Sequence, residues 1–93
     1  DRLGLEYLDT GAMYRGVAFA VLRRGVDPAD VPAVADVARS VVLEVTRSAC
    51  IVDGEDASAA IRGAEVTTAV TAVAANPEVR VEMVARQRAW VAE

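Results

Sequence analysis

The chain contains neither histidine nor lysine, and all ten of its basic residues are arginine. The absence of lysine excludes a Walker-type phosphate-binding lysine and a Schiff-base lysine from these 93 residues. The absence of histidine excludes an imidazole general base or metal ligand. Arginine is the better bidentate ligand for phosphate, so any anion bound here is expected to be held by guanidinium groups.

Cysteine, aromatic residues and long apolar runs are also scarce. Cys50 is the single cysteine, which excludes a disulfide framework, and its apolar neighbours predict a buried thiol. Most of the 54% apolar fraction is Ala and Val, so a core built from these residues alone is marginal. No apolar run is long enough for a membrane span, and the start has no signal-peptide layout, so we expect a cytoplasmic protein without a membrane partner. The four aromatic residues are Tyr7, Tyr14, Phe19 and Trp90.

The net charge is −4, which argues against non-specific binding of nucleic acid, because such binding needs a basic face. The length suits one small domain or a part of a larger one. Composition therefore gives no reason to expect a nucleic-acid partner.

Residues 9–15 read Asp-Thr-Gly-Ala-Met-Tyr-Arg and follow a strand-like run at residues 5–9 that has no partner strand within reach. A helix that opens at Thr10 and Gly11 presents unpaired N–H groups and a positive dipole end, which favour a bound phosphate. Arg15 lies about one turn into this helix, where the dipole disfavours a cation and a bound anion would reverse that effect. Ordinary N-capping and a solvated arginine explain the same residues without a ligand.

The remaining pattern predicts mostly helices around a small antiparallel sheet. Residues 11–24 are periodic and apolar, especially at 18–22, so this helix is expected to be buried on most sides and to end at Gly25. A weaker helix is expected at 30–39. Strands are expected at 40–46, 49–52 and 55–57, with a turn at Asp53-Gly54, then a single turn at 58–62 and a helix at 65–75.

Asn76-Pro77 is a sharp start signal for a last helix, with Asn as the N-cap and Pro at the first position. Arg80 again stands in the first turn, against the dipole. Glu82 and Arg86 are spaced for an ion pair, and the stretch from Arg86 to Arg88 is typical of a solvated face. Val79, Met83 and Trp90 share the face expected to be buried.

Five blocks of the sequence resemble the bacterial cytidylate kinases (CMP/dCMP kinases) in order, spacing and identity. The resemblance covers essentially the whole chain, and five blocks together are far more specific than one short motif. The blocks are Leu8–Arg15, Val52–Asp56, Ala60–Arg62, Glu65-Val66 and Val73–Arg88.

This resemblance implies an α/β P-loop nucleoside monophosphate kinase that transfers the γ-phosphoryl group of ATP to CMP or dCMP with Mg²⁺. Residues 1–25 then belong to the core, 26–75 to the insert that binds the monophosphate, and 76–93 to a helix that returns to the core. The Gly-rich phosphate loop would precede Asp1, and the lid with a Gly-Arg-Asp motif would follow Glu93. No residue here is therefore expected to be catalytic or to bind ATP or Mg²⁺, and the segment alone is expected to be inactive.

The resemblance also implies four ligands for CMP. By position in the family motifs, Arg15 binds the phosphate, Thr10 lines the acceptor site, and Thr71 and Arg80 contact cytosine. Serine is frequent in the family at both threonine positions, and the hydroxyl group is retained. An arginine suits cytosine because cytosine accepts hydrogen bonds at N3 and O2, whereas uracil carries a proton on N3.

Two other interpretations remain open. Helix faces rich in Val, together with Trp90, are also typical of a non-enzymatic helical module that binds another chain, and helices without their packing surface are expected to self-associate. A different nucleoside monophosphate kinase would share the phosphate chemistry and differ in the base pocket. Thr71 and Arg80 favour a cytidylate kinase over that possibility.

Overall fold

The structure is a computed structural model that describes residues 10–45 and 49–92. The predicted helices, turn and strands are confirmed in type and order within these ranges, with bounds that shift by at most three residues. The strand expected at residues 5–9 lies outside the described residues. The elements are α2 (Thr10–Arg23), α3 (Val31–Ser40), β1 (Leu43–Val45), β2 (Cys50–Val52), β3 (Glu55–Asp56), the 3₁₀ turn η1 (Ala60–Arg62), α4 (Ala64–Ala75) and α5 (Pro77–Ala92).

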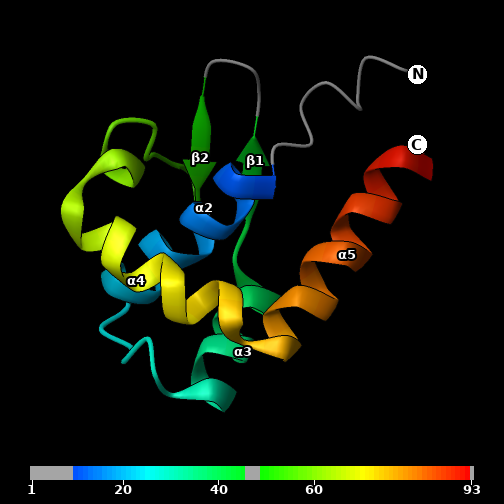
Figure 1. The fold of residues 1–93 in the computed structure, drawn as a ribbon. Coiled ribbons are helices and arrows are strands. Elements are labelled where there is room, and N and C mark those ends of the chain that lie inside the picture. The colour runs from blue at the N-terminus through cyan, green and yellow to red at the C-terminus, as the bar shows by residue number, and fades with distance from the viewer. Residues whose placement is uncertain (1–9, 46–48, 93) are drawn as a thin grey trace.

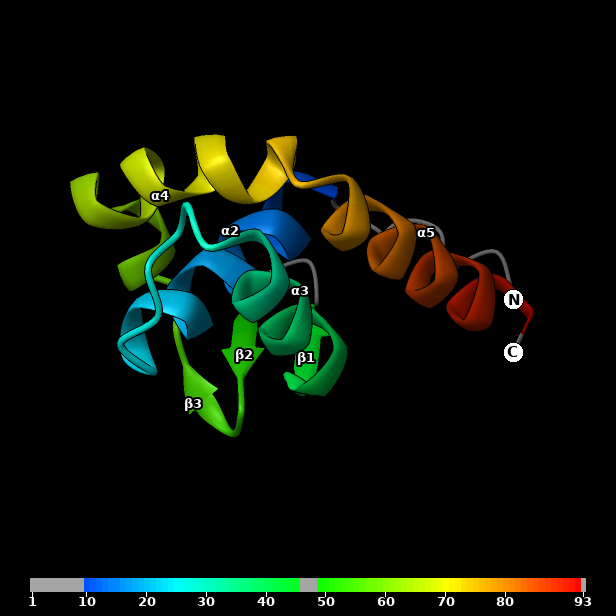
Figure 2. The same cartoon turned by 90° about the horizontal axis from the view of Figure 1, so that it is seen from below.

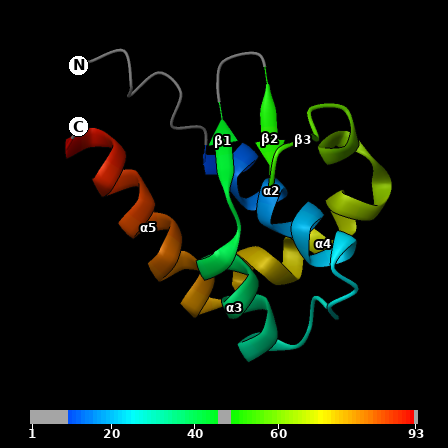
Figure 3. The same cartoon turned by 180° about the vertical axis from the view of Figure 1, so that it is seen from behind.

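The three strands form one antiparallel sheet in the order β1-β2-β3, which lies against α2 (Figure 3). Leu43 pairs with Val52, and both side chains are buried together with that of Cys50, as predicted for the thiol. The turn between β2 and β3 has positive φ at Asp53 (51°) and Gly54 (83°), which is the backbone that an Asp-Gly hairpin turn requires.

α2 is the central helix, with the sheet, η1, α3 and α4 around it (Figure 1). Met13, Val17 and Val21 are fully buried, as their spacing predicts. Gly16 lies against the sheet so closely that a Cβ atom there would be 2.9 Å from Cδ2 of Leu43. The helix is buried on most sides, as expected, but Leu22 is 37% exposed because its side of α2 opens onto a surface hollow.

The end of α2 is held by its own backbone and by Arg24. Gly25 has φ 73°, its N–H donates to Leu22 O (3.1 Å), and the next N–H, that of Val26, donates to Val21 O (2.9 Å). This is a Schellman ending, as Arg-Arg-Gly predicts. The Arg24 guanidinium donates to Asp53 Oδ2 (3.0 Å) and to the hydroxyl of a serine that ends α3, so α2, α3 and the hairpin are joined at one point.

α5 is joined to α3 by Arg86, and here the expectation of a solvated arginine is wrong. The Arg86 side chain is only 18% exposed, and its guanidinium donates to Ala38 O (3.0 Å) and Val41 O (2.6 Å) as well as to Glu82 Oε2 (3.2 Å). The predicted ion pair with Glu82 is confirmed. The carbonyl acceptors lie 45 and 48 residues away in sequence, so helical spacing alone does not reveal them.

Val79 and Met83 are buried as predicted, whereas the side chain of Trp90 lies outside the described part of the molecule. Across residues 10–45 and 49–92, no helix has both the length and the apolar sequence that crossing a membrane requires.

Candidate functional site

The four residues implied as CMP ligands lie on three helices that contact one another. Thr10 and Arg15 belong to α2, Thr71 lies in the second half of α4, and Arg80 is the fourth residue of α5. α2 contacts both α4 and α5, and α4 contacts α5. The fold therefore brings together the helices that contain all four residues, although these residues span 71 positions of the sequence.

α2 and α4 lie side by side and run in opposite directions (Figures 1 and 2). Phe19 and Leu22, near the end of α2, line a hollow with the start of α4. Arg15 shares their helical stripe, because spacings of four and three residues fall on one face. At about 1.5 Å per residue, Arg15 lies roughly 6–10 Å back along α2, level with the half of α4 that carries Thr71.

α5 leads from the end of α4 towards the start of α2. The side-chain amide of Gln87 donates to Met13 Sδ at 3.8 Å, which joins the third turn of α5 to the first turn of α2. Arg80 lies seven residues before Gln87, two helical turns back, and so on the same face of α5. Arg80 therefore lies near the side of α5 that contacts α2, at its solvent-exposed edge.

The side chains of Arg15, Thr71 and Arg80 are exposed. Within residues 10–45 and 49–92, neither guanidinium group has an ion pair or hydrogen-bond partner. By contrast, Arg24 and Arg86 are both engaged with protein acceptors. Arg15 and Arg80 are thus available for an external anion or acceptor group.

The dipole argument applies to the two arginines unequally. Because α2 begins at Thr10 among the described residues, Arg15 is its sixth residue and lies in the second turn. The unfavourable effect of a helix N-terminus on a cation has largely decayed there, so the expectation of a misplaced Arg15 is weakened. Arg80, the fourth residue of α5, is closer to its helix start and retains more of the effect.

Arg80 lines a shallow surface hollow of about 360 Å³ along one face of α5. Val81 and Val84 in its wall are 71% and 43% exposed, and Arg88 lies at its far end. This face combines apolar surface with guanidinium groups at both ends. Such a surface offers guanidinium donors to a hydrogen-bond acceptor beside apolar side chains.

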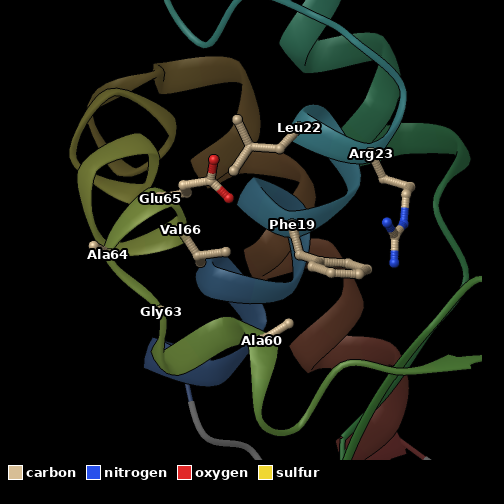
Figure 4. A pocket seen from close by; sticks show the side chains of 8 residues that line it. All are labelled: Phe19, Leu22, Arg23, Ala60, Gly63, Ala64, Glu65 and Val66. Carbon is tan, nitrogen blue, oxygen red and sulfur yellow. The ribbon is translucent and has the colours of Figure 1, made fainter.

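A second hollow, of about 380 Å³, lies between the end of α2, η1 and the start of α4 (Figure 4). Arg23 lies over the Phe19 ring, 4.9 Å from its centroid, and pairs with Glu55. None of the four predicted ligands lines this hollow, and no sequence motif indicates it. The lining residues are Phe19, Leu22, Arg23, Ala60, Gly63, Ala64, Glu65 and Val66.

Metal binding was not expected of this segment. Among the described residues, no group of three or more Cys, Asp or Glu side chains is arranged to hold a metal ion.

The lowered pKa of Asp53 has a structural cause: Val42 N–H donates to its Oδ1 (2.9 Å), and Arg24 donates to its Oδ2.

Comparison with known proteins identifies the family of this chain. The family model described as cytidylate kinase matches residues 1–93. The chain belongs to the cytidylate kinase family. The resemblance carried by the five sequence blocks is thereby confirmed, and with it the P-loop nucleoside monophosphate kinase class.

The relatives cover almost the whole chain. A cytidylate kinase of Mycobacterium leprae is 50% identical over 86 residues, which are 92% of this chain and 39% of that protein. One from Nocardia farcinica is 50% identical over 91 residues, 94% of this chain and 39% of its own. A bifunctional pantoate ligase/cytidylate kinase of Synechococcus is 43% identical over 95% of this chain and 19% of its own. The chain thus spans about two fifths of the first two relatives.

Proposed function

We propose that the protein is a cytidylate kinase in which this segment binds the acceptor nucleotide, CMP or dCMP. Membership of the family and near-complete coverage by relatives named cytidylate kinase support the proposal. The observation that carries it is that Arg15 and Arg80, exposed and without a partner among the described residues, lie on adjoining helices with Thr71 between them in sequence.

In this proposal Arg15 binds the CMP phosphate by a bidentate contact, and Thr10 lines the same part of the site. Thr71 and Arg80 contact the base. An arginine aimed at N3 and O2 of cytosine donates to two acceptors, whereas uracil would oppose a donor with a donor. A buried mismatch of that kind costs about 1–3 kcal/mol, which is enough for selection.

Phosphoryl transfer depends on positioning and on stabilisation of charge more than on a strong base, so the absence of histidine is no obstacle to it. ATP with Mg²⁺ would supply the transferred group, and we assign no residue of this segment to either. The segment holds the acceptor in place, and by itself it is inactive. Residues 1–25 and 76–93 would belong to the kinase core and residues 26–75 to the monophosphate-binding insert, in a cytoplasmic enzyme of pyrimidine nucleotide metabolism.

Isothermal calorimetry tests the proposal. The protein as the cell makes it, with any sequence that flanks residues 1–93, is titrated with CMP and then with UMP, and its mass is followed by size-exclusion chromatography. Saturable heat with CMP and a weaker response to UMP is expected. A stable dimer that gives no heat with either nucleotide would instead favour the helical interaction module and contradict the proposal.

A further inference from the structure

Asn76 is the one buried polar or charged residue among the described residues, at 4% exposure. Both ends of its side-chain amide are used. Oδ1 accepts from the backbone N–H groups of Glu78 (3.0 Å) and Val79 (3.4 Å), which caps α5 as the sequence predicts. Nδ2 donates to Val31 O at the start of α3 (3.0 Å), a contact across 45 residues that the sequence does not predict.

This residue is also the whole connection between α4 and α5. α4 ends at Ala75 and α5 begins at Pro77, and Asn76 between them has extended backbone angles (φ −76°, ψ 113°). Figures 1 and 2 show the start of α3 beside this junction. The angle between α4 and α5 is therefore set where Asn76 is tied to a third helix.

Thr71 lies five residues before Asn76 and Arg80 four residues after it. At 1.5 Å per residue, these two residues stand about 6–8 Å from the junction along their helices. A change of about 10° between the helices would therefore move one relative to the other by roughly 1 Å. Displacements of that size are enough to weaken a bound geometry strongly.

α3 acts as a brace because its other end is also tied to α5. Arg86 donates to Ala38 O and Val41 O at the end of α3, while Asn76 holds Val31 O at its start. A helix fixed to α5 at two well-separated points resists rotation of α5 about the junction. The contact between Nδ2 of Asn76 and Val31 O is the one of these that directly restrains the α4–α5 connection.

We propose that Asn76 is a positioning residue for base selection: by tying the α4–α5 junction to α3, it fixes the separation of Thr71 and Arg80 and thereby the preference for cytosine over uracil. This inference rests on the proposed function. It adds a role for a residue that does not contact the nucleotide.

Two variants separate this role from simple helix capping. Asn76→Ser keeps a side chain that caps α5 and loses the donor to Val31 O. Asn76→Asp caps at least as well but places a carboxylate oxygen against the Val31 carbonyl. Asp30→Ala is the matched control, because it removes the N-cap of α3 (Ala33 N–H to Asp30 Oδ1, 3.3 Å) without changing the side chain of Asn76.

Phosphorylation of CMP and UMP by the protein as the cell makes it is the readout, with kcat and KM measured separately. We expect Asn76→Ser to lower the CMP-to-UMP ratio of kcat/KM about 5- to 10-fold, through KM for CMP and with kcat within about twofold. Asn76→Asp should lower it further. Asp30→Ala should keep the ratio while shifting the urea midpoint by an amount similar to that for Asn76→Ser.

A capping role alone predicts the opposite order, with Asn76→Asp close to the unaltered protein. That order, or a ratio that falls equally in Asp30→Ala, overturns the inference. If Arg80→Ala changes the ratio and both Asn76 variants keep it, the positioning role fails and the proposed function stands. If the unaltered protein shows no preference for CMP, both fail. Should Asn76→Asp not fold, Asn76→Ser decides by comparison with Asp30→Ala.

Discussion

Arg80 and Arg86 are six residues apart on one helix, and the structure uses them in opposite ways. Arg86 is half-buried and donates to two carbonyl groups of the α3 end and to Glu82. Arg80 is exposed and has no partner among the described residues. The difference is one of surroundings, since residue type and helix are the same. An arginine that satisfies buried acceptors stabilises the fold, whereas one kept in the open is available to a ligand.

The same division runs through the other described arginines. Arg23, Arg24 and Arg39 pair with carboxylates, whereas Arg15, Arg62 and Arg88 lack partners among the described residues. Absence of a partner is therefore insufficient to mark a site. Arg15 and Arg80 are singled out because the family resemblance implies them as CMP ligands and because their helices contact each other.

Replacing Arg86 should give the largest effect on folding. Arg86→Ala leaves the acceptors Ala38 O and Val41 O without their donor and a half-buried Glu82 without its partner, so the free energy of unfolding should fall by about 2–3 kcal/mol. Urea denaturation measures it. Arg88→Ala, the exposed control on the same helix, should change stability by no more than about 0.5 kcal/mol. Equal losses of unfolding free energy in the two variants would contradict the distinction between structural and ligand-available arginines.

Asp53→Asn should cost less and should depend on pH. The pKa of Asp53 is lowered by the Val42 N–H and by Arg24, so its charged form stabilises the fold above the unfolded pKa of about 4 and loses this effect as pH falls below it. The carboxylate is 40% exposed, so solvent screening limits the expected cost to about 1 kcal/mol at pH 7. Asparagine tolerates the positive φ.

Unfolding measured between pH 7 and pH 2.5 checks this prediction. The difference between Asp53→Asn and the unaltered protein should shrink as the pH falls, because the aspartate becomes protonated and resembles the amide. A difference that stays constant across that range would show that the charge of Asp53 contributes nothing.

The pair between Arg23 and Glu55 should contribute little, although it joins α2 to β3. Both side chains are about half exposed (60% and 49%), and exposed pairs contribute about 0.2–1 kcal/mol. A double-mutant cycle with Arg23→Gln and Glu55→Gln should give a coupling near 0.5 kcal/mol that disappears in 1 M salt. A coupling that persists at high salt would place Arg23 with Arg86 as a structural arginine.

Arg80→Gln should have the smallest effect on stability and the opposite sign. Removal of a cation from the first turns of α5 should raise the free energy of unfolding by about 0.3 kcal/mol in the absence of nucleotide. Thermal unfolding with and without CMP measures this. The variant should also lose most of the stabilisation that CMP gives to the unaltered protein. A clear loss of stability without ligand would mean that Arg80 supports the fold.

Local signals predicted the elements well. Asn76-Pro77 predicted the start of α5, Asp53-Gly54 predicted the hairpin turn, and Arg-Arg-Gly predicted the end of α2, because each depends on backbone chemistry within a few residues. The buried face of α2 with Met13 and Val17 was also predicted correctly, because helical periodicity is a local signal. Such signals are sufficient where the partner atoms are neighbours in sequence.

Contacts between distant segments were not predicted. Arg86 was expected in solvent, because nothing near it in sequence shows that the end of α3 presents two carbonyl groups there. For Asn76 the sequence predicts only the cap of α5, because Val31 is 45 residues away along the chain. For the candidate site, the sequence supplied the four residues through family resemblance, and the fold adds that their helices contact one another.

The claim that these residues select CMP is tested most directly by steady-state phosphorylation of CMP and UMP with Arg15→Ala and Arg80→Ala variants of the protein as the cell makes it. Arg80→Ala should reduce the CMP-to-UMP ratio of kcat/KM by about tenfold or more, because it removes the proposed donor to cytosine N3 and O2. Arg15→Ala should lower both rates and keep the ratio, because phosphate is common to both nucleotides. Equal losses for CMP and UMP in both variants would contradict the account.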